Sequence, residues 1–123
     1  VWPDVADGIQ PSNAETIAFQ LIVPGLDEEL FYRGLLLVAL NEAFAGRVNV
    51  FGAPIGWGGV ATAVLFGVVH GCSWDGGHFD LGVEAMLWAG VPGILLLWLR
   101  ERTGSLVLPF VAHNLANGLP TLV

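Results

Sequence analysis

The sequence is poor in charge and contains no lysine. Charged residues make up 12% of its 123 positions, and four arginines stand against 11 aspartates and glutamates, which gives a formal net charge of −7 at pH 7. An acidic chain of this kind is poorly suited to bind nucleic acid or an anionic lipid surface. We therefore expect no nucleic-acid partner. Acidity without lysine is also typical of proteins adapted to high salt, which suggests a halophilic source.

Cysteine occurs once, as Cys72, which excludes a disulfide within this sequence and any metal site built from several cysteines. We expect Cys72 to be a small buried residue beside a helix end. Two hydrolase signatures are also missing. There is no His-Glu-x-x-His, which excludes a zincin-type helix. The segment around Ser73 lacks the second glycine of Gly-x-Ser-x-Gly, which disfavours a serine protease.

Apolar residues, in contrast, are abundant. They make up 54% of the chain, and the mean hydropathy is +0.70, too high for an ordinary soluble domain. Residues 48–74 and 103–123 contain no Asp, Glu, Lys or Arg, and a helix of roughly 20 residues crosses a bilayer. A soluble bundle is the alternative, but so short a chain cannot cover this much apolar surface. We predict an all-α fold, a polytopic transmembrane bundle of about four helices that is part of a larger membrane protein.

Helix signals divide the chain into four segments within a single domain, residues 1–123. A capping box at 12–15 predicts a helix over residues 13–44, which bends at Pro24 and Gly25. Further helices are expected at 57–72, at 81–99 and from Ser105 onward. Residues 46–54 read as a connection and residues 71–80 as a polar loop at the opposite membrane face.

A charged stretch at residues 27–33 interrupts the first apolar helix. Glu29 and Arg33 are four positions apart and can pair on one helical face, whereas Glu28 points about 100° away and stays available for chemistry. An ionisable residue inside a membrane is costly and marks a functional candidate.

Polar residues of three helices are expected at similar depth. At a rise of about 1.5 Å per residue, measured from the end of the bundle that carries the arginines, Glu28 lies roughly 24 Å deep and His70 roughly 21 Å. On the last helix, Asn117 lies roughly 18 Å deep, with His113 about one turn shallower. We therefore expect these four residues to form one site.

A carboxylate, two imidazoles and an amide suit the hydrolysis of an acyl bond, because the carboxylate can take a proton from water and the N–H groups can stabilise an oxyanion. The same glutamate and two histidines could instead hold zinc with water in the open position. Sequence alone leaves both open. Each residue also has a structural interpretation as a helix–helix hydrogen-bond partner, and intramembrane carboxylates and histidines also line proton relays and transporters.

Three motifs resemble one family. The segment Glu28-Glu29-x-x-x-Arg33 resembles the Glu-Glu-x-x-x-Arg motif of the CPBP family of intramembrane proteases, which includes the CAAX prenyl endopeptidase Rce1 and the bacteriocin-immunity (Abi) proteins. Residues 66–70 resemble its Phe-x-x-x-His motif, and residues 113–117 its His-x-x-x-Asn motif. The motifs follow the family's order, and the resemblance covers about residues 14–120.

The resemblance implies an all-helical membrane fold and endopeptidase activity. In it, Glu28 and His70 would activate water, and His113 and Asn117 would form the oxyanion hole. The family is often described as metalloproteases, but a general-base route requires no metal, so a zinc ion stays open.

The remaining implications concern the supporting pair, the partners and the location. Glu29 and Arg33 would support the catalytic glutamate. The substrate would be a membrane-associated peptide or protein, with CAAX-type prenyl-protein processing as one form, and the location would be the plasma membrane of a prokaryote. The alternative function is a non-catalytic member that binds a membrane peptide or confers bacteriocin immunity.

Overall fold

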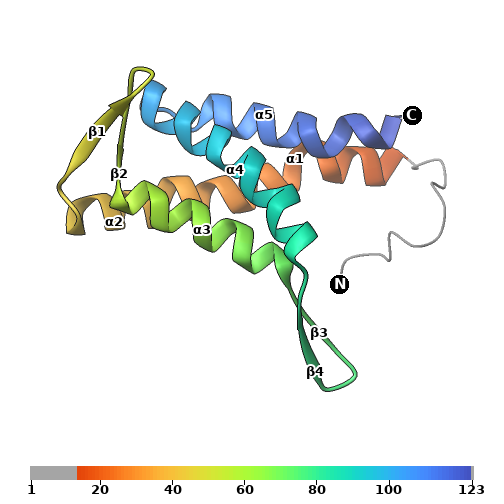
Figure 1. Cartoon of the computed structure of the whole chain (residues 1–123). Coiled ribbons are helices and arrows are strands. Elements are labelled where there is room, and N and C mark those ends of the chain that lie inside the picture. Colours follow the sequence, from red (N-terminus) through yellow and green to blue (C-terminus); the bar gives the residue numbers. More distant parts are fainter. Residues whose placement is uncertain (1–13, 123) are drawn as a thin grey trace.

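The structure, a computed structural model, describes residues 14–122, and this part of the chain is a set of packed helices joined in two places by β-hairpins (Figure 1). The helices are α1 (Ala14–Glu29), η1 (Leu30–Leu36), α2 (Leu37–Ala43), α3 (Trp57–Gly71), α4 (Val83–Thr103), α5 (Val107–Gly118) and η2 (Leu119–Leu122). The strands are β1 (Arg47–Val50), β2 (Ala53–Gly56), β3 (Cys72–Asp75) and β4 (His78–Leu81). The first two residues of the predicted capping box lie outside the described residues.

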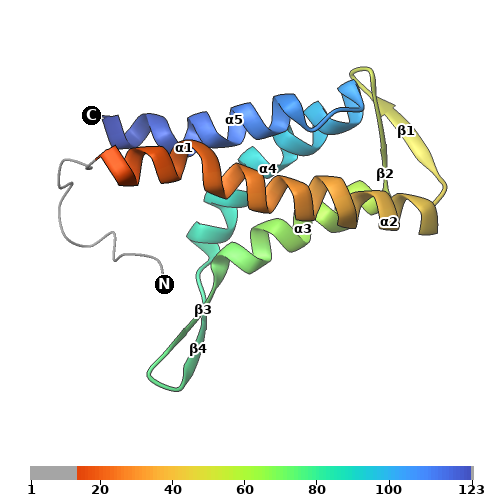
Figure 2. The ribbon, with the colours of Figure 1, turned by 180° about the vertical axis from the view of Figure 1, so that it is seen from behind.

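The first helical segment is one long rod made of α1, η1 and α2 (Figure 2). Helix α1 continues through Pro24, which is buried together with Gly25. The middle part, η1, has π-helical hydrogen bonding and begins directly after Glu29. Wider π-helical turns inside helices are frequent at functional sites, because they rotate the side chains that follow. The rod agrees with the helix predicted for residues 13–44.

Helix α5 packs along α1, α3 packs on α4 and on α2, and α4 also contacts α5. Small residues make the closest crossing possible. A Cβ atom on Gly67 of α3 would lie 3.1 Å from the backbone oxygen of Met86 and 3.2 Å from Cα of Gly90, both on α4. Contacts between helix backbones through glycine are typical of membrane bundles. These contacts bring α1, α3 and α5 round one centre.

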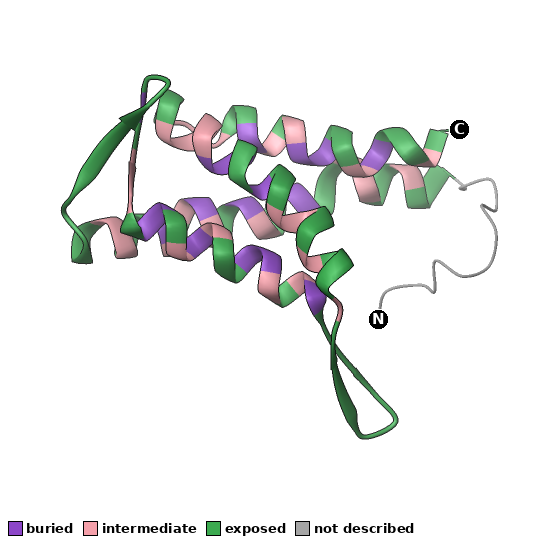
Figure 3. Ribbon diagram, viewed as in Figure 1, coloured by how far each residue is buried: buried purple, intermediate pink, exposed green. Residues whose placement is uncertain are grey.

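The distribution of polar residues is inverted relative to a soluble protein. Buried side chains include Glu29, Arg33 and His113, whereas large apolar side chains are exposed along every α-helix from α1 to α5 (Figure 3). Water penalises such an exposed apolar surface, and a lipid environment does not. The arrangement fits a protein whose outer surface contacts lipid or further helices.

Two connections are β-hairpins, which corrects the all-α prediction. Strands β1 and β2 pair antiparallel around Phe51 and Gly52, and β3 and β4 pair around Gly76 and Gly77. All four of these turn residues have positive φ, as the two-residue turns that match the twist of a hairpin require. Cys72 begins β3 and is exposed, so the prediction that it is buried was wrong.

Within residues 14–122, one helix is long and apolar enough to cross a membrane, namely α4, Val83–Thr103. Helix α3 is apolar but has 15 residues, and α5 has 12. At about 1.5 Å per residue, both are shorter than the roughly 30 Å of a hydrocarbon core. The two charge-free segments, which were predicted to cross the membrane, thus each contain a short helix together with other elements. The four predicted helical segments are present, but α3 and α5 are too short to cross a membrane by themselves.

Candidate active site

Two adjacent carboxylates at the end of α1 have different surroundings. Glu29 is 1% exposed, and its Oε1 atom accepts a hydrogen bond from Nη1 of Arg33 at 3.0 Å. This is the pair expected from the four-residue spacing. The side chain of Glu28 points elsewhere and is 16% exposed. The helix therefore separates a buried, paired carboxylate from one that solvent or substrate can reach.

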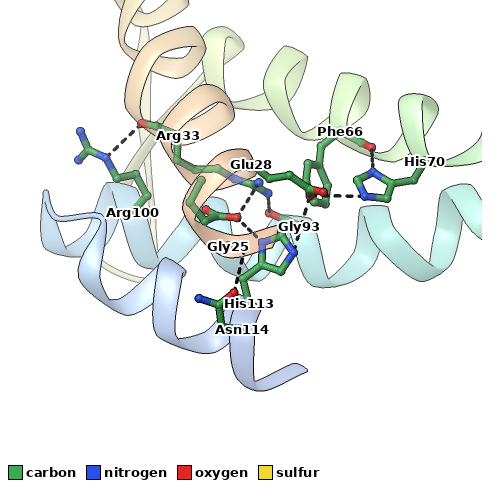
Figure 4. A network of polar contacts seen from close by, with 10 residues as sticks. Gly25, Glu28, Arg33, Phe66, His70, Gly93, Arg100, His113 and Asn114 are labelled. Atoms are coloured by element: carbon green, nitrogen blue, oxygen red, sulfur yellow. Dashed lines mark hydrogen bonds and ion pairs between the residues drawn. The ribbon is translucent and has the colours of Figure 1, made fainter. Parts of the chain in front are cut away.

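Arg33 is fully buried and is held on three sides. Besides Glu29, its Nη2 atom donates to the carbonyl oxygen of Gly93 on α4 at 3.0 Å, and its Cζ atom lies 4.2 Å from the centre of the Phe66 ring on α3 (Figure 4). A charged group in a low-dielectric interior needs such partners, because an isolated one is strongly disfavoured. Arg33 therefore ties α1, α3 and α4 together behind the carboxylates.

His113 of α5 joins the buried pair. Its Nδ1 atom lies 2.7 Å from Oε1 of Glu29, so the ring donates Nδ1–H to the carboxylate. The other ring nitrogen, Nε2, lies 3.7 Å from Oε2 of Glu28. The imidazole held by Glu29 thus also faces Glu28, without a hydrogen bond to it.

His70 of α3 approaches the same oxygen from another side. Its Nδ1 atom lies 2.7 Å from the carbonyl oxygen of Phe66, which can only accept, so Nδ1 carries the proton. Its Nε2 atom lies 3.5 Å from Oε2 of Glu28. Two imidazole Nε2 atoms therefore face a single carboxylate oxygen, and this buried oxygen has no hydrogen-bond partner within residues 14–122. Both separations exceed the roughly 2.7–3.2 Å of an ordinary hydrogen bond.

Asn117, the fourth predicted residue, is half-buried, and no hydrogen bond or ion pair connects it to the described side chains of the cluster. Its neighbour Asn114, which the sequence analysis did not select, is 3% exposed. The Oδ1 atom of Asn114 accepts a hydrogen bond from the backbone N–H of Gly25 at 2.8 Å, and its Nδ2 atom donates to the Ile22 carbonyl at 3.4 Å. These contacts fasten α5 to α1 beside Pro24, where the helical hydrogen-bond ladder is interrupted. Because a proline interrupts the backbone hydrogen bonds of a helix, Pro24 indicated in the sequence that a backbone group near it would need a polar partner.

An open cavity of about 690 Å³ lies beside the cluster. Besides Glu28 and His70, its lining includes a second acidic residue of α1, aromatic residues of η1, a valine of α3 and the first two residues of β3: Asp27, Phe31, Tyr32, Val69, Cys72 and Ser73. A mostly apolar cavity with a few convergent polar groups is the usual form of a substrate site.

The described residues contain no group of three or more histidines, cysteines, aspartates or glutamates arranged to hold a metal ion. The two imidazoles and Glu28 meet around one oxygen, and zinc binding by this set stays a prediction.

Comparison with known families gives one match. Residues 11–119 match the family model described as type II CAAX prenyl endopeptidase Rce1-like. Comparisons with curated proteins and with solved structures gave no match. The matched segment contains all of the cluster residues described above.

Proposed function

This chain belongs to the Rce1-like family of type II CAAX prenyl endopeptidases, a family of integral membrane proteases, and on that basis we propose that Glu28 activates water for the hydrolysis of a peptide bond. The observation that carries the proposal is the approach of two imidazole Nε2 atoms, at 3.5 and 3.7 Å, to one oxygen of Glu28. The Glu28 side chain is 16% exposed and lines an open cavity, so substrate and water can approach its carboxylate.

The reaction begins when the ionised Glu28 takes a proton from water and the resulting hydroxide attacks the scissile carbonyl carbon. His70 supports this step, since its Nε2 atom can accept or share a proton at the same oxygen. The carbonyl oxygen becomes an oxyanion in the tetrahedral intermediate. The proton held by Glu28 then passes to the leaving nitrogen, the C–N bond breaks, and a new carboxylate and an amine are released.

His113 is proposed to stabilise the oxyanion. When Nε2 is protonated the ring is an imidazolium, and Nε2–H can donate toward the site while Nδ1–H stays on Glu29. The Glu29 carboxylate holds the ring through Nδ1, and Arg33 holds that carboxylate in place. Asn117, one helical turn further on the same face of α5, is proposed as the second donor once substrate is bound.

The proposed substrate is a membrane-associated peptide or protein. The family description supports prenylated CAAX-type proteins as one candidate, and the apolar cavity wall supports an apolar substrate segment in general. We also propose the plasma membrane of a prokaryote as the location, with the exposed apolar surface as support for membrane residence.

The test is cleavage of a library of membrane peptides by the full-length protein in detergent. Peptide-bond hydrolysis by the wild-type protein, at a defined bond, supports the proposal. If the folded protein retains a peptide uncut, the alternative function of a peptide-binding or immunity protein replaces it.

A parallel sample treated with a strong chelator tests the role of metal. Activity that survives chelation supports water activation by Glu28 alone. Activity that is lost on chelation and restored by added Zn²⁺ would replace this route with zinc catalysis.

A further inference from the structure

From the β3–β4 hairpin we propose that the free edge of β3 binds the substrate peptide as an additional β-strand and so presents its scissile bond to Glu28 and His70. This inference rests on the proposed function, because it assigns a binding mode to the same site. The hairpin projects from the ends of α3 and α4, away from the packed helices (Figure 1).

The position of the cavity indicates which part of the hairpin borders the site. Cys72 and Ser73 are consecutive residues of β3, and both line the cavity that contains Glu28 and His70. Consecutive side chains of a strand point to opposite faces of its sheet. A cavity that both residues line therefore runs along an edge of the strand and not over one face. Strand β4 occupies the other edge and contributes no residue to this cavity lining.

The hydrogen-bond pattern of the hairpin shows which backbone groups this edge offers. With a two-residue turn, the flanking pair Asp75 and His78 exchanges hydrogen bonds, and the pairs then alternate. The hydrogen bond from Gly82 N–H to the Gly71 carbonyl, at 2.8 Å, continues this alternation at the base of the hairpin. The backbone groups of Cys72 and Trp74 therefore point away from β4.

One of these groups is already used within the protein. The N–H of Cys72 caps α3 by donating to the carbonyls of Val68 and Val69. The Cys72 carbonyl and both backbone groups of Trp74 remain at the free edge. An extended peptide can satisfy all three, because a neighbouring strand lies about 4.8 Å away and offers complementary groups at alternate residues.

The faces of the hairpin define the class of peptide. Cys72 and Trp74 lie on one face opposite Leu81 and Phe79, and all four residues are exposed. The other face carries Ser73, Asp75, His78 and Asp80. A strand added beside β3 continues both faces, so we expect a peptide whose side chains alternate between apolar and polar. The part of the substrate that pairs with β3, next to the scissile bond, is thus expected to be an extended, amphipathic peptide.

The decisive variant is Trp74→Pro, which removes the N–H at the free edge and leaves the ladder with β4 intact, since proline is tolerated at strand edges. We expect the specificity constant to fall about ten-fold, as for the loss of a substrate hydrogen bond with some distortion. The matched control is Phe79→Pro at the cross-strand position, whose N–H points to the opposite edge. It should lose less activity than Trp74→Pro, because it leaves every backbone group at the free edge of β3 in place. Trp74→Ala removes the side chain and keeps the backbone N–H, and it should lose less than Trp74→Pro.

Modified peptides test the same edge without changing the protein. N-methylation of successive backbone nitrogens in a cleaved peptide should reduce cleavage at alternate positions only. Equal activity of Trp74→Pro and wild type, an equal loss in Phe79→Pro, or an N-methyl scan without alternation would each overturn the proposal.

A binding measurement separates this inference from the proposed function. If the wild-type protein cuts nothing, binding of a fluorescently labelled peptide of alternating leucine and serine residues is measured by anisotropy, with wild type, Trp74→Pro and Phe79→Pro. Weaker binding by Trp74→Pro alone would support edge pairing even though the peptidase proposal failed. No difference between the three proteins would contradict edge pairing.

Discussion

His113 and Arg33 contact the same oxygen of the same carboxylate. Nδ1 of His113 lies 2.7 Å and Nη1 of Arg33 lies 3.0 Å from Oε1 of Glu29. Since Glu29 is 1% exposed, this oxygen is a buried point at which α5 is fixed to the start of the rod, in addition to the contacts of Asn114. The orientation of the His113 ring, and hence the position of its Nε2 atom near Glu28, depends on this contact.

The two nitrogens of His113 can be tested separately. In His113→Asn the amide nitrogen takes the place of Nδ1 and can still donate to Glu29, but nothing remains at Nε2. We expect a stable protein whose kcat is reduced about 100-fold or more, as for the loss of one oxyanion-hole donor. In His113→Gln the amide reaches the Nε2 position but no longer donates to Glu29. This variant should be less stable than His113→Asn, but it should retain more activity per folded molecule. The opposite order of stabilities would contradict the assignment of the two nitrogens.

Glu29→Gln tests the buried ion pair. The amide keeps the shape but leaves the Arg33 charge without a counter-ion, and breaking a buried pair in this way costs about 3 kcal/mol or more. We expect a clearly lower midpoint of thermal unfolding in detergent. Glu42→Gln, at an exposed position of α2, is the control. It should change the free energy of unfolding by less than about 0.5 kcal/mol and leave the midpoint close to that of wild type. Equal midpoints for the two variants would show that the pair is not structural.

Gly25→Ala tests the close contact between α1 and α5. A Cβ atom at this position would lie 2.5 Å from Oδ1 of Asn114, so the side chain that accepts the Gly25 N–H must move. We expect loss of activity together with a loss of stability of about 1–3 kcal/mol, typical of overpacking. Gly46→Ala, where an added Cβ meets no atom within 4 Å, is the control. If Gly25→Ala costs as much stability in an Asn114→Ala background as in the wild-type protein, the clash is not the cause.

The exposed apolar side chains lead to a prediction about extraction. Residues such as Leu35, Val64 and Trp88 are 63%, 58% and 75% exposed on three different helices. Since such a surface is favourable only in lipid or against further helices, we expect the protein to stay in the membrane fraction after washing with alkaline carbonate and to require detergent for release. Recovery of a folded protein in the carbonate supernatant would contradict membrane residence.

The helices could be predicted from the sequence because their boundaries carry strong local signals. The third predicted helix ends near Arg100, and Gly104, with φ 68°, caps α4 in the left-handed conformation that favours glycine. The two β-hairpins were not predicted, although the sequence carries a signal for the β3–β4 hairpin. Gly76 and Gly77 stand between two short segments in which apolar and polar residues alternate, a pattern that predicts a two-residue hairpin and was interpreted as a loop.

From the rise along their helices, Glu28 and His70 were expected at similar depth, and in the structure the His70 Nε2 and Glu28 Oε2 atoms lie 3.5 Å apart. The same estimate put Asn117 closer to them than His113, whereas in the structure His113 makes the contacts. Axial rise alone neglects how a helix is rotated and where it crosses its neighbours. The role of Asn114 depends on the tertiary contact of α5 with the Pro24 region, which no local pattern specifies.

The most direct test of the account is a comparison of wild type, Glu28→Gln and Glu42→Gln on one cleaved peptide, at equal amounts of folded protein in the same detergent. Glu28→Gln keeps the size of the side chain and removes the base. The account predicts that Glu28→Gln binds the peptide with wild-type affinity and that its kcat falls by at least about 1000-fold, which combines loss of the base with loss of the oriented water. Glu42→Gln should cleave as wild type does. Undiminished cleavage by Glu28→Gln would contradict the central claim that Glu28 activates the attacking water.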